Sequence, residues 1–82
     1  MTARPSSVVL YTRQGCHLCD DAAALLARNG LAFDSVDIDG DAALRQRYDE
    51  CVPVVVIDGK ERFRGRIDEL LLRRLLAQRG GD

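Results

Sequence analysis

Two cysteines separated by two residues are the most reactive feature of this 82-residue chain. Cys16 and Cys19 lie within the stretch TRQGCHLCDD, residues 12–21, after a run typical of a β-strand and before a run typical of a helix. With Cys16 at the helix start and Cys19 one turn further, the two thiols lie close enough to form a disulfide. The spacing therefore predicts a redox-active pair, with a metal site as the alternative for the same motif.

The start of the predicted helix makes the two cysteines chemically different. Cys16 faces unpaired backbone N–H groups at the positive end of the helix dipole, and these favour a thiolate. At helix N-termini and in such motifs the pKa of a cysteine falls from about 8.5 to roughly 3.5–7.5. Cys19 lies a turn deeper and is expected to be less exposed. We therefore assign Cys16 as the nucleophile and Cys19 as the thiol that resolves the mixed disulfide.

His17, between the two cysteines, has three interpretations: an imidazolium that stabilises the Cys16 thiolate, a metal ligand, or an exposed helix residue. The third is favoured because adjacent residues on a helix point about 100° apart. A zinc site needs four ligands, and sequence neighbours at a helix start converge poorly on one ion, so no metal site is expected. The set in question is Cys16, His17, Cys19 and Cys51. An iron–sulfur cluster shared between two chains is a further alternative.

Composition restricts the remaining function classes. With 12 basic and 13 acidic residues the net charge is −1, which gives no overall attraction to nucleic acid or an anionic membrane. The alternating bases Lys60, Arg62, Arg64 and Arg66 are interpreted as the solvated face of a strand, or else as a basic rim for an acidic partner. No signal peptide and no apolar run of about 20 residues is visible, so a cytoplasmic protein is expected.

The periodicity along the chain predicts the order β-α-β-α-β-β-α in a single domain, residues 1–82, with flexible ends at 1–6 and 79–82. Predicted strands span 7–12, 31–39, 52–57 and 60–64, and predicted helices span 16–29, 41–48 and 67–78. The first βαβ unit requires parallel strands, whereas the Asp58-Gly59 turn makes the last pair antiparallel. The fold class is therefore α/β, a mixed four-stranded sheet flanked by helices. The final helix is expected to bury a broad, leucine-rich face.

The stretch LYTRQGCHLCDDA, followed later by CVPVVVIDGKERFRGRIDEL, resembles glutaredoxin-like proteins of the thioredoxin fold over roughly residues 7–78. GCHLCD is similar to a small bacterial subgroup of that family. The resemblance implies a monomeric thiol–disulfide oxidoreductase of cell redox homeostasis and electron transport, without a tightly bound cofactor. Its partners would be protein disulfides or glutathione, the latter as co-substrate, and a recycling reductase, with no nucleic acid and no membrane. The alternatives are a metal or iron–sulfur delivery module that uses Cys16, and a binding domain whose thiols are incidental.

The same resemblance implies further residues near the cysteine pair. Pro53 matches the family's cis-proline opposite the motif. Val52 would offer its backbone N–H and C=O to a substrate, as an added strand does. Cys51 stands where many glutaredoxins have threonine, and it is interpreted as a small buried apolar residue. The alternative for Cys51, which like His17 would then modulate the site, is a third thiol that pairs with one of the other cysteines on oxidation.

Glutathione binding is implied less completely. Arg13 would stand for the family's basic residue before the motif, and Asp68 for its aspartate at the start of the last helix. Gly65 matches one glycine of a Gly-Gly pair, but Arg64 replaces the other. Arg64 or Arg66 would then either bind a carboxylate of glutathione or crowd it out.

Overall fold

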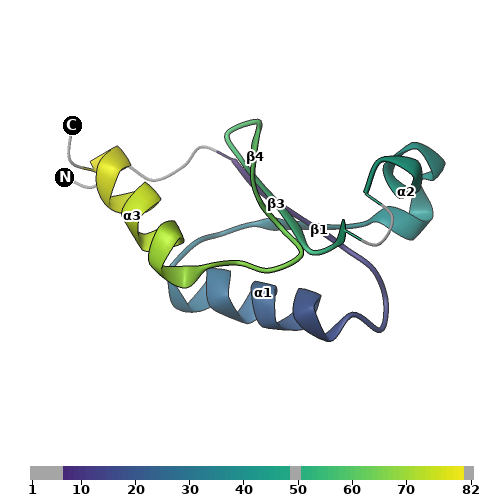
Figure 1. The fold of residues 1–82 in the computed structure, drawn as a ribbon, viewed down its shortest axis with the longest axis horizontal. Helices are drawn as coiled ribbons and strands as arrows, with labels where there is room; N and C mark the ends of the chain where they lie inside the picture. The colour runs from purple at the N-terminus through teal and green to yellow at the C-terminus, as the bar shows by residue number, and fades with distance from the viewer. Residues whose placement is uncertain (1–6, 49–50, 81–82) are drawn as a thin grey trace.

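The computed structural model describes residues 7–48 and 51–80, which form a four-stranded sheet and three α-helices (Figure 1). The strands are β1 (Val8–Thr12), β2 (Asp34–Asp37), β3 (Val54–Ile57) and β4 (Lys60–Arg64). The helices are α1 (His17–Arg28), α2 (Ala42–Tyr48) and α3 (Glu69–Gly80), and a 3₁₀-helical turn, η1 (Ile38–Gly40), precedes α2. The strand order is β2-β1-β3-β4, with β1 and β2 parallel and the other neighbours antiparallel. The predicted fold class and strand directions are confirmed.

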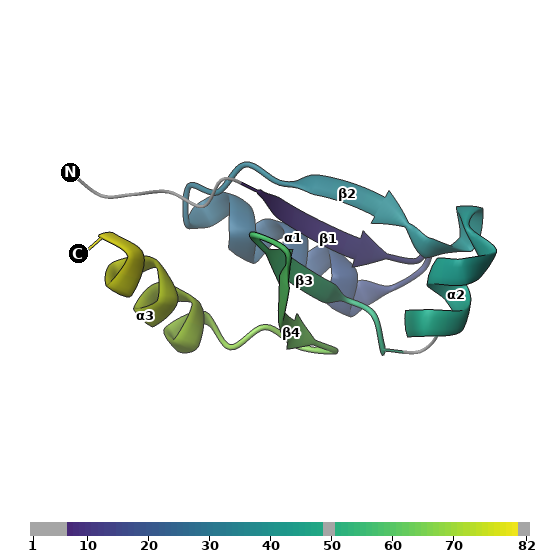
Figure 2. The same cartoon turned by 90° about the horizontal axis from the view of Figure 1, so that it is seen from above.

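The centre of the sheet is apolar on both faces, and this positions two separate clusters of buried side chains. In β3, Val55 and Ile57 join a cluster that also contains residues of α1 and α3, whereas Val54 belongs to a second cluster near α2. Figure 2 shows α2 and α3 at opposite ends of the sheet. The second cluster contains Cys19, Ile38, Tyr48, Val52 and Val54. The cysteine motif therefore lies against the α2 end of the molecule.

Several predicted boundaries differ from the observed ones. β2 ends at Asp37 and not at residue 39, because the Asp37 carboxylate accepts the Asp39 N–H at 2.9 Å and starts the η1 turn. β3 begins at Val54, two residues later than predicted. Residues 79 and 80, expected in a flexible tail, continue α3. The other predicted flexible residues, 1–6 and 81–82, lie outside the described part of the chain.

The predicted broad buried face of the last helix is wrong. Leu72 is fully buried, but Leu70 is 61% exposed and Leu71 is 48% exposed. Successive residues on a helix point about 100° apart, so three leucines in a row cannot face the same core. Even with this leucine content, none of the helices in the described ranges is long and apolar enough to cross a bilayer.

The first residue of α3 is fastened to the last turn of α1. The Glu69 carboxylate accepts Arg28 Nη2–H at 2.8 Å and Arg28 Nε–H at 3.0 Å. It also accepts Asn29 Nδ2–H at 2.9 Å, and Arg73 lies 3.6 Å from the same carboxylate. The hydrogen bonds from Arg28 and Asn29 and the nearby positive charges lower the pKa of Glu69 from its ordinary value of 4.5 to about 2. The contact therefore depends on an ionised Glu69.

Replacing Glu69 by glutamine is expected to destabilise the fold near neutral pH but much less in acid. A lowered carboxyl pKa contributes stability that is fully present above about pH 4.5 and is lost as pH falls toward about 2. Urea unfolding of wild type and Glu69→Gln at pH 6, 4 and 2.5 would therefore give midpoints that come closer together as the pH falls. Because Arg28 is largely exposed, added salt should also reduce the difference.

Glu61→Gln is the matched control for this experiment. Glu61 accepts two hydrogen bonds from Arg64, which lower its pKa, but the pair lies within one strand and joins no separate elements. It should cost less stability than Glu69→Gln at pH 6. Equal losses in the two variants, or a Glu69→Gln difference that grows in acid, would contradict the fastening of α3 to α1.

Candidate active site

Cys16 occupies the N-cap position of α1, as the sequence predicts. Its backbone is extended, with φ −94° and ψ 104°, and its Sγ accepts the Cys19 N–H at 3.0 Å. Gly15, which precedes this N-cap residue, has φ +75°, in the left-handed region that glycine adopts without a steric cost. One otherwise unpaired N–H of the first helical turn therefore points at the Cys16 sulfur, where it favours a negative charge.

The two cysteines are bonded to each other and are unequally accessible. Cys16 and Cys19 form a disulfide, with their Cα atoms 5.2 Å apart. Cys19 is 2% exposed, whereas Cys16 is only half-buried. An incoming disulfide can reach the Cys16 sulfur more easily than the Cys19 sulfur. This difference in exposure is the one expected if Cys16 attacks the substrate and the buried Cys19 then resolves the mixed disulfide.

His17 is exposed, and its side chain makes no hydrogen bond or ion pair with any residue that the structure describes. This agrees with its interpretation as an exposed helix residue. Within residues 7–48 and 51–80, no three side chains of histidine, cysteine, aspartate or glutamate are grouped so that they could hold a metal ion. The four-ligand zinc set considered from the sequence is therefore not assembled.

The segment around Pro53 lies beside the cysteine pair. The Val52–Pro53 peptide bond is cis, and Val52 belongs to the cluster that contains Cys19 and against which Cys16 packs. Gly65 directly follows β4, and its N–H donates to the Pro53 carbonyl oxygen at 2.7 Å. Thus the structure brings the cysteines, Val52, Pro53 and Gly65 together. The use of the Val52 backbone by a substrate stays a prediction.

Cys51 is not the small buried apolar residue that the sequence suggests. It is half-buried, and Arg64 Nη1–H donates to its Sγ at 3.7 Å. It also packs against the same cluster as Cys16. Because β4 returns alongside β3, Arg64 reaches the residue that precedes the proline segment, a contact that sequence spacing alone does not reveal.

Three of the charged residues expected to hold glutathione are engaged elsewhere. Arg13 pairs with Asp39 at 3.2 Å, and Asp39 also lies 3.4 Å from Arg45. Asp68 caps its own helix, because its Oδ1 accepts the N–H groups of the second and third residues of α3 at 3.0 and 3.2 Å. Arg64 donates two hydrogen bonds to Glu61, which raise the arginine's pKa. Arg13, Arg64 and Asp68 are thus already paired or used in capping, whereas Arg66 forms no ion pair with the part of the chain that the structure describes.

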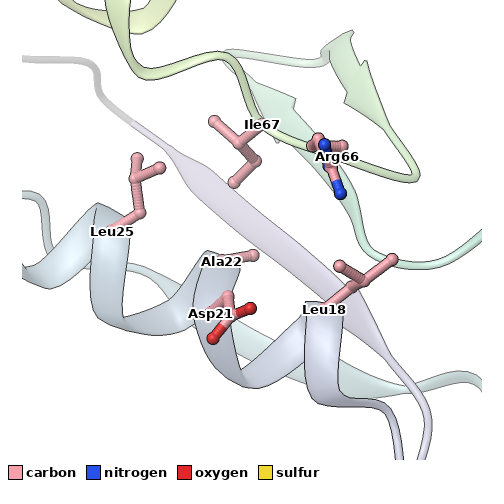
Figure 3. Close-up of a pocket in the computed structure, with 6 residues that line it drawn as sticks. All are labelled: Leu18, Asp21, Ala22, Leu25, Arg66 and Ile67. Carbon is pink, nitrogen blue, oxygen red and sulfur yellow. The ribbon is translucent and has the colours of Figure 1, made fainter.

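A groove next to the motif was missed by sequence reasoning (Figure 3). It has a volume of about 230 Å³ and runs between α1 and the connection from β4 to α3. Its lining residues are Leu18, Asp21, Ala22, Leu25, Arg66 and Ile67. The four residues from α1 follow the helical spacing of three and four, which also describes a core face, so the sequence gives no sign that part of this stripe is open.

Comparison with known proteins places the chain among proteins of similar length. A family model described as a glutaredoxin-like domain matches residues 7–77. An uncharacterised protein of Mycobacterium tuberculosis is 38% identical over an alignment of 85 positions, gaps included, that covers 93% of this chain and 87% of that protein. Glutaredoxin 3 of Escherichia coli is 35% identical over 60 residues, or 67% of this chain and 72% of that protein. The X-ray structure of a protein from X. campestris has a TM-score of 0.74 and 42% identity, covering 88% of this chain and 97% of that one.

Proposed function

Because the chain belongs to the family of glutaredoxin-like domains, we propose that it is a dithiol thiol–disulfide oxidoreductase that reduces protein disulfides or mixed disulfides with glutathione. The family and the Cys16–Cys19 pair fit a thiol oxidoreductase. The observation that carries the finer proposal is the N–H of Cys19 donating to Cys16 Sγ at the start of α1. The same N–H is available to a Cys16 thiolate once the disulfide is reduced.

The proposed reaction transfers two electrons from the reduced cysteine pair to the substrate. The Cys16 thiolate attacks one sulfur of a substrate disulfide, forming a mixed disulfide and releasing the other substrate sulfur as a thiolate. The Cys19 thiolate then attacks Cys16 Sγ, which closes the Cys16–Cys19 disulfide and releases the second substrate thiol. An external dithiol, or two molecules of a monothiol such as glutathione, would reduce the pair again. The protein needs no bound cofactor for either step.

Removing the Cys19 thiol should block the second step and leave the mixed disulfide of the first step on Cys16. Reduced Cys19→Ser, mixed with a small disulfide such as hydroxyethyl disulfide, is expected to retain one substrate thiol per chain on Cys16, detected by intact mass and peptide mapping. Wild type should instead retain none and become oxidised at the pair. If wild type leaves the disulfide unreduced, the proposed function is wrong.

Cys51 provides the matched control, because it is the third cysteine of the chain. Cys51→Ser should release product as wild type does and still form the Cys16–Cys19 disulfide. If Cys19→Ser turns over but the double variant Cys19→Ser/Cys51→Ser traps the adduct, then Cys51 acts as a resolving thiol. Iron and zinc analysis of the purified protein tests the metal-delivery alternative, for which bound metal on Cys16 is required.

A further inference from the structure

The groove beside Leu18 has the position, size and charge of a specificity site. We propose that it receives an apolar side chain next to the reactive cysteine of a polypeptide disulfide, with Arg66 pairing an acidic residue of the same substrate. The inference rests on the proposed function and narrows it to polypeptide substrates. The apolar residues that line the groove are Leu18, Ala22, Leu25 and Ile67.

The volume of the groove favours one side chain over a whole small molecule. At about 230 Å³ it is below the roughly 300–1,000 Å³ that is typical of small-molecule sites. Leu18 is 43% exposed, so apolar surface at this place is in contact with water until a partner covers it. Burial of an apolar substrate side chain in the groove, against Leu18 and Ile67, would remove the apolar surface of the substrate and that of the groove from water.

The groove begins at the cysteine motif. Leu18 lies between the two cysteines, and Figure 3 shows it at one end of the groove with Leu25 at the other. Leu18 is two residues from Cys16, a span of at most roughly 7 Å along the chain. A residue adjacent to a cysteine that is joined to Cys16 can therefore reach the groove. This continuity distinguishes it from the hollow between β4 and α3 that is lined by Arg62, Phe63 and Leu71, among others.

The charges on its two sides give the groove a polarity. Arg66 on one side and Asp21 on the other form no ion pair with any residue that the structure describes. Arg13 and Arg64, by contrast, already pair with Asp39 and Glu61. Arg66 is thus the arginine near the site that is available for a carboxylate, and Asp21 would repel one on the opposite side.

The same observations argue against glutathione as the occupant of the groove. Glutathione would bring its charges over a floor of four apolar side chains, and a charge buried against that floor, away from Arg66 and Asp21, is costly. Two of the charged residues expected to bind it, Arg13 and Asp68, are engaged by Asp39 and by the first turn of α3. A polypeptide with a leucine-like residue and a nearby acid matches both the floor and the free arginine.

The test uses short peptides of one cysteine each, joined by a disulfide to a nitrothiobenzoate leaving group. The peptides differ at two positions only. The residue beside the cysteine, tested on its N-terminal and on its C-terminal side, is leucine or its near-isostere asparagine. The residue beyond it is glutamate or lysine. Prereduced protein attacks the peptide sulfur, and the coloured nitrothiobenzoate thiolate leaves. Cys19 then displaces the peptide thiol, so the two electrons come from the cysteine pair and no recycling enzyme is needed.

Wild type is expected to react about tenfold faster with the best leucine–glutamate peptide than with its asparagine counterpart, within the range that one apolar group gives. Leu18→Asn should remove the preference for leucine. Arg66→Glu should reverse the preference from glutamate to lysine. The matched control Arg62→Glu makes the same charge change on β4, outside the groove, and should leave both ratios as in wild type.

Equal rates for leucine and asparagine peptides in wild type would overturn the proposal. So would preferences that survive both Leu18→Asn and Arg66→Glu, or a glutathione–nitrothiobenzoate disulfide that reacts faster than every peptide. Concentration-dependent dimerisation abolished by Leu18→Asn would show that a second copy covers the groove, which also overturns it. Failure of wild type to reduce any of these disulfides would instead refute the proposed function itself.

Discussion

Replacing Cys16 by serine is expected to lower the rate of disulfide reduction to the uncatalysed background, a loss of roughly a thousandfold or more. A serine hydroxyl is not ionised at neutral pH and no general base is arranged beside it among the described residues. The change should leave the start of α1 intact, because serine is a favoured N-cap residue whose oxygen can accept the Cys19 N–H. The expected loss is therefore chemical and not a consequence of unfolding.

Urea unfolding and turnover measured on the same samples separate these two causes. Reduced wild type and reduced Cys16→Ser should unfold at similar urea concentrations, whereas Cys16→Ala, which loses the acceptor as well, should be about 1 kcal/mol less stable. The comparison must use reduced proteins, because only wild type can form the Cys16–Cys19 disulfide.

His17→Ala is the control inside the same motif. Its side chain is exposed and has no described partner, so the variant should keep most of the wild-type rate. A Cys16→Ser protein that retains full turnover would mean that another group attacks the substrate. A His17→Ala protein as inactive as Cys16→Ser would mean that the imidazole has a role in the chemistry that its position does not suggest.

The parts of the site that could be predicted are those governed by local sequence. Cys16 caps α1 because a polar or ionisable side chain after a left-handed Gly15 can accept the unpaired N–H groups, and this needs no distant contact. The Asp58-Gly59 turn has φ of 51° and 82°, the left-handed pair that a tight hairpin requires. The parallel first pair follows from the crossover and the antiparallel last pair from the hairpin turn, whereas the position of β3 beside β1 was not predicted.

The parts that could not be predicted depend on which side chains meet across the fold. Arg13 was expected to face a carboxylate of the substrate, but η1 brings Asp39 to it first. Cys51 was expected to be buried, but the return of β4 places Arg64 against its sulfur. Leu18 belongs to an apolar helical stripe whose exposed end is decided by where the β4–α3 connection lies. Periodicity marks an apolar face without showing how much of it is covered.

Replacing Leu26 by alanine is expected to destabilise the fold by about 2–5 kcal/mol, the cost of a cavity at a fully packed leucine. Leu26 is 0% exposed and lies on the face of α1 that packs against the sheet. Small domains have a total stability of roughly 5–15 kcal/mol and tend toward the low end, so this single change removes a large share. The urea midpoint should fall by roughly 2 M, given a slope of about 1–2 kcal/mol per M.

Leu70→Ala is the matched control, because it makes the same change at a leucine that is 61% exposed on α3 and should alter the stability by no more than about 0.5 kcal/mol. Since α1 also carries Cys16 at its N-cap, the rate of disulfide reduction should depend on the fraction of protein that is folded. In urea that unfolds half of Leu26→Ala, its turnover should fall with the folded fraction while Leu70→Ala keeps its rate. Equal stability losses in the two variants would mean that α1 is not packed on the sheet. A Leu26→Ala protein that loses activity while still folded would mean that the cavity disturbs the cysteine pair directly.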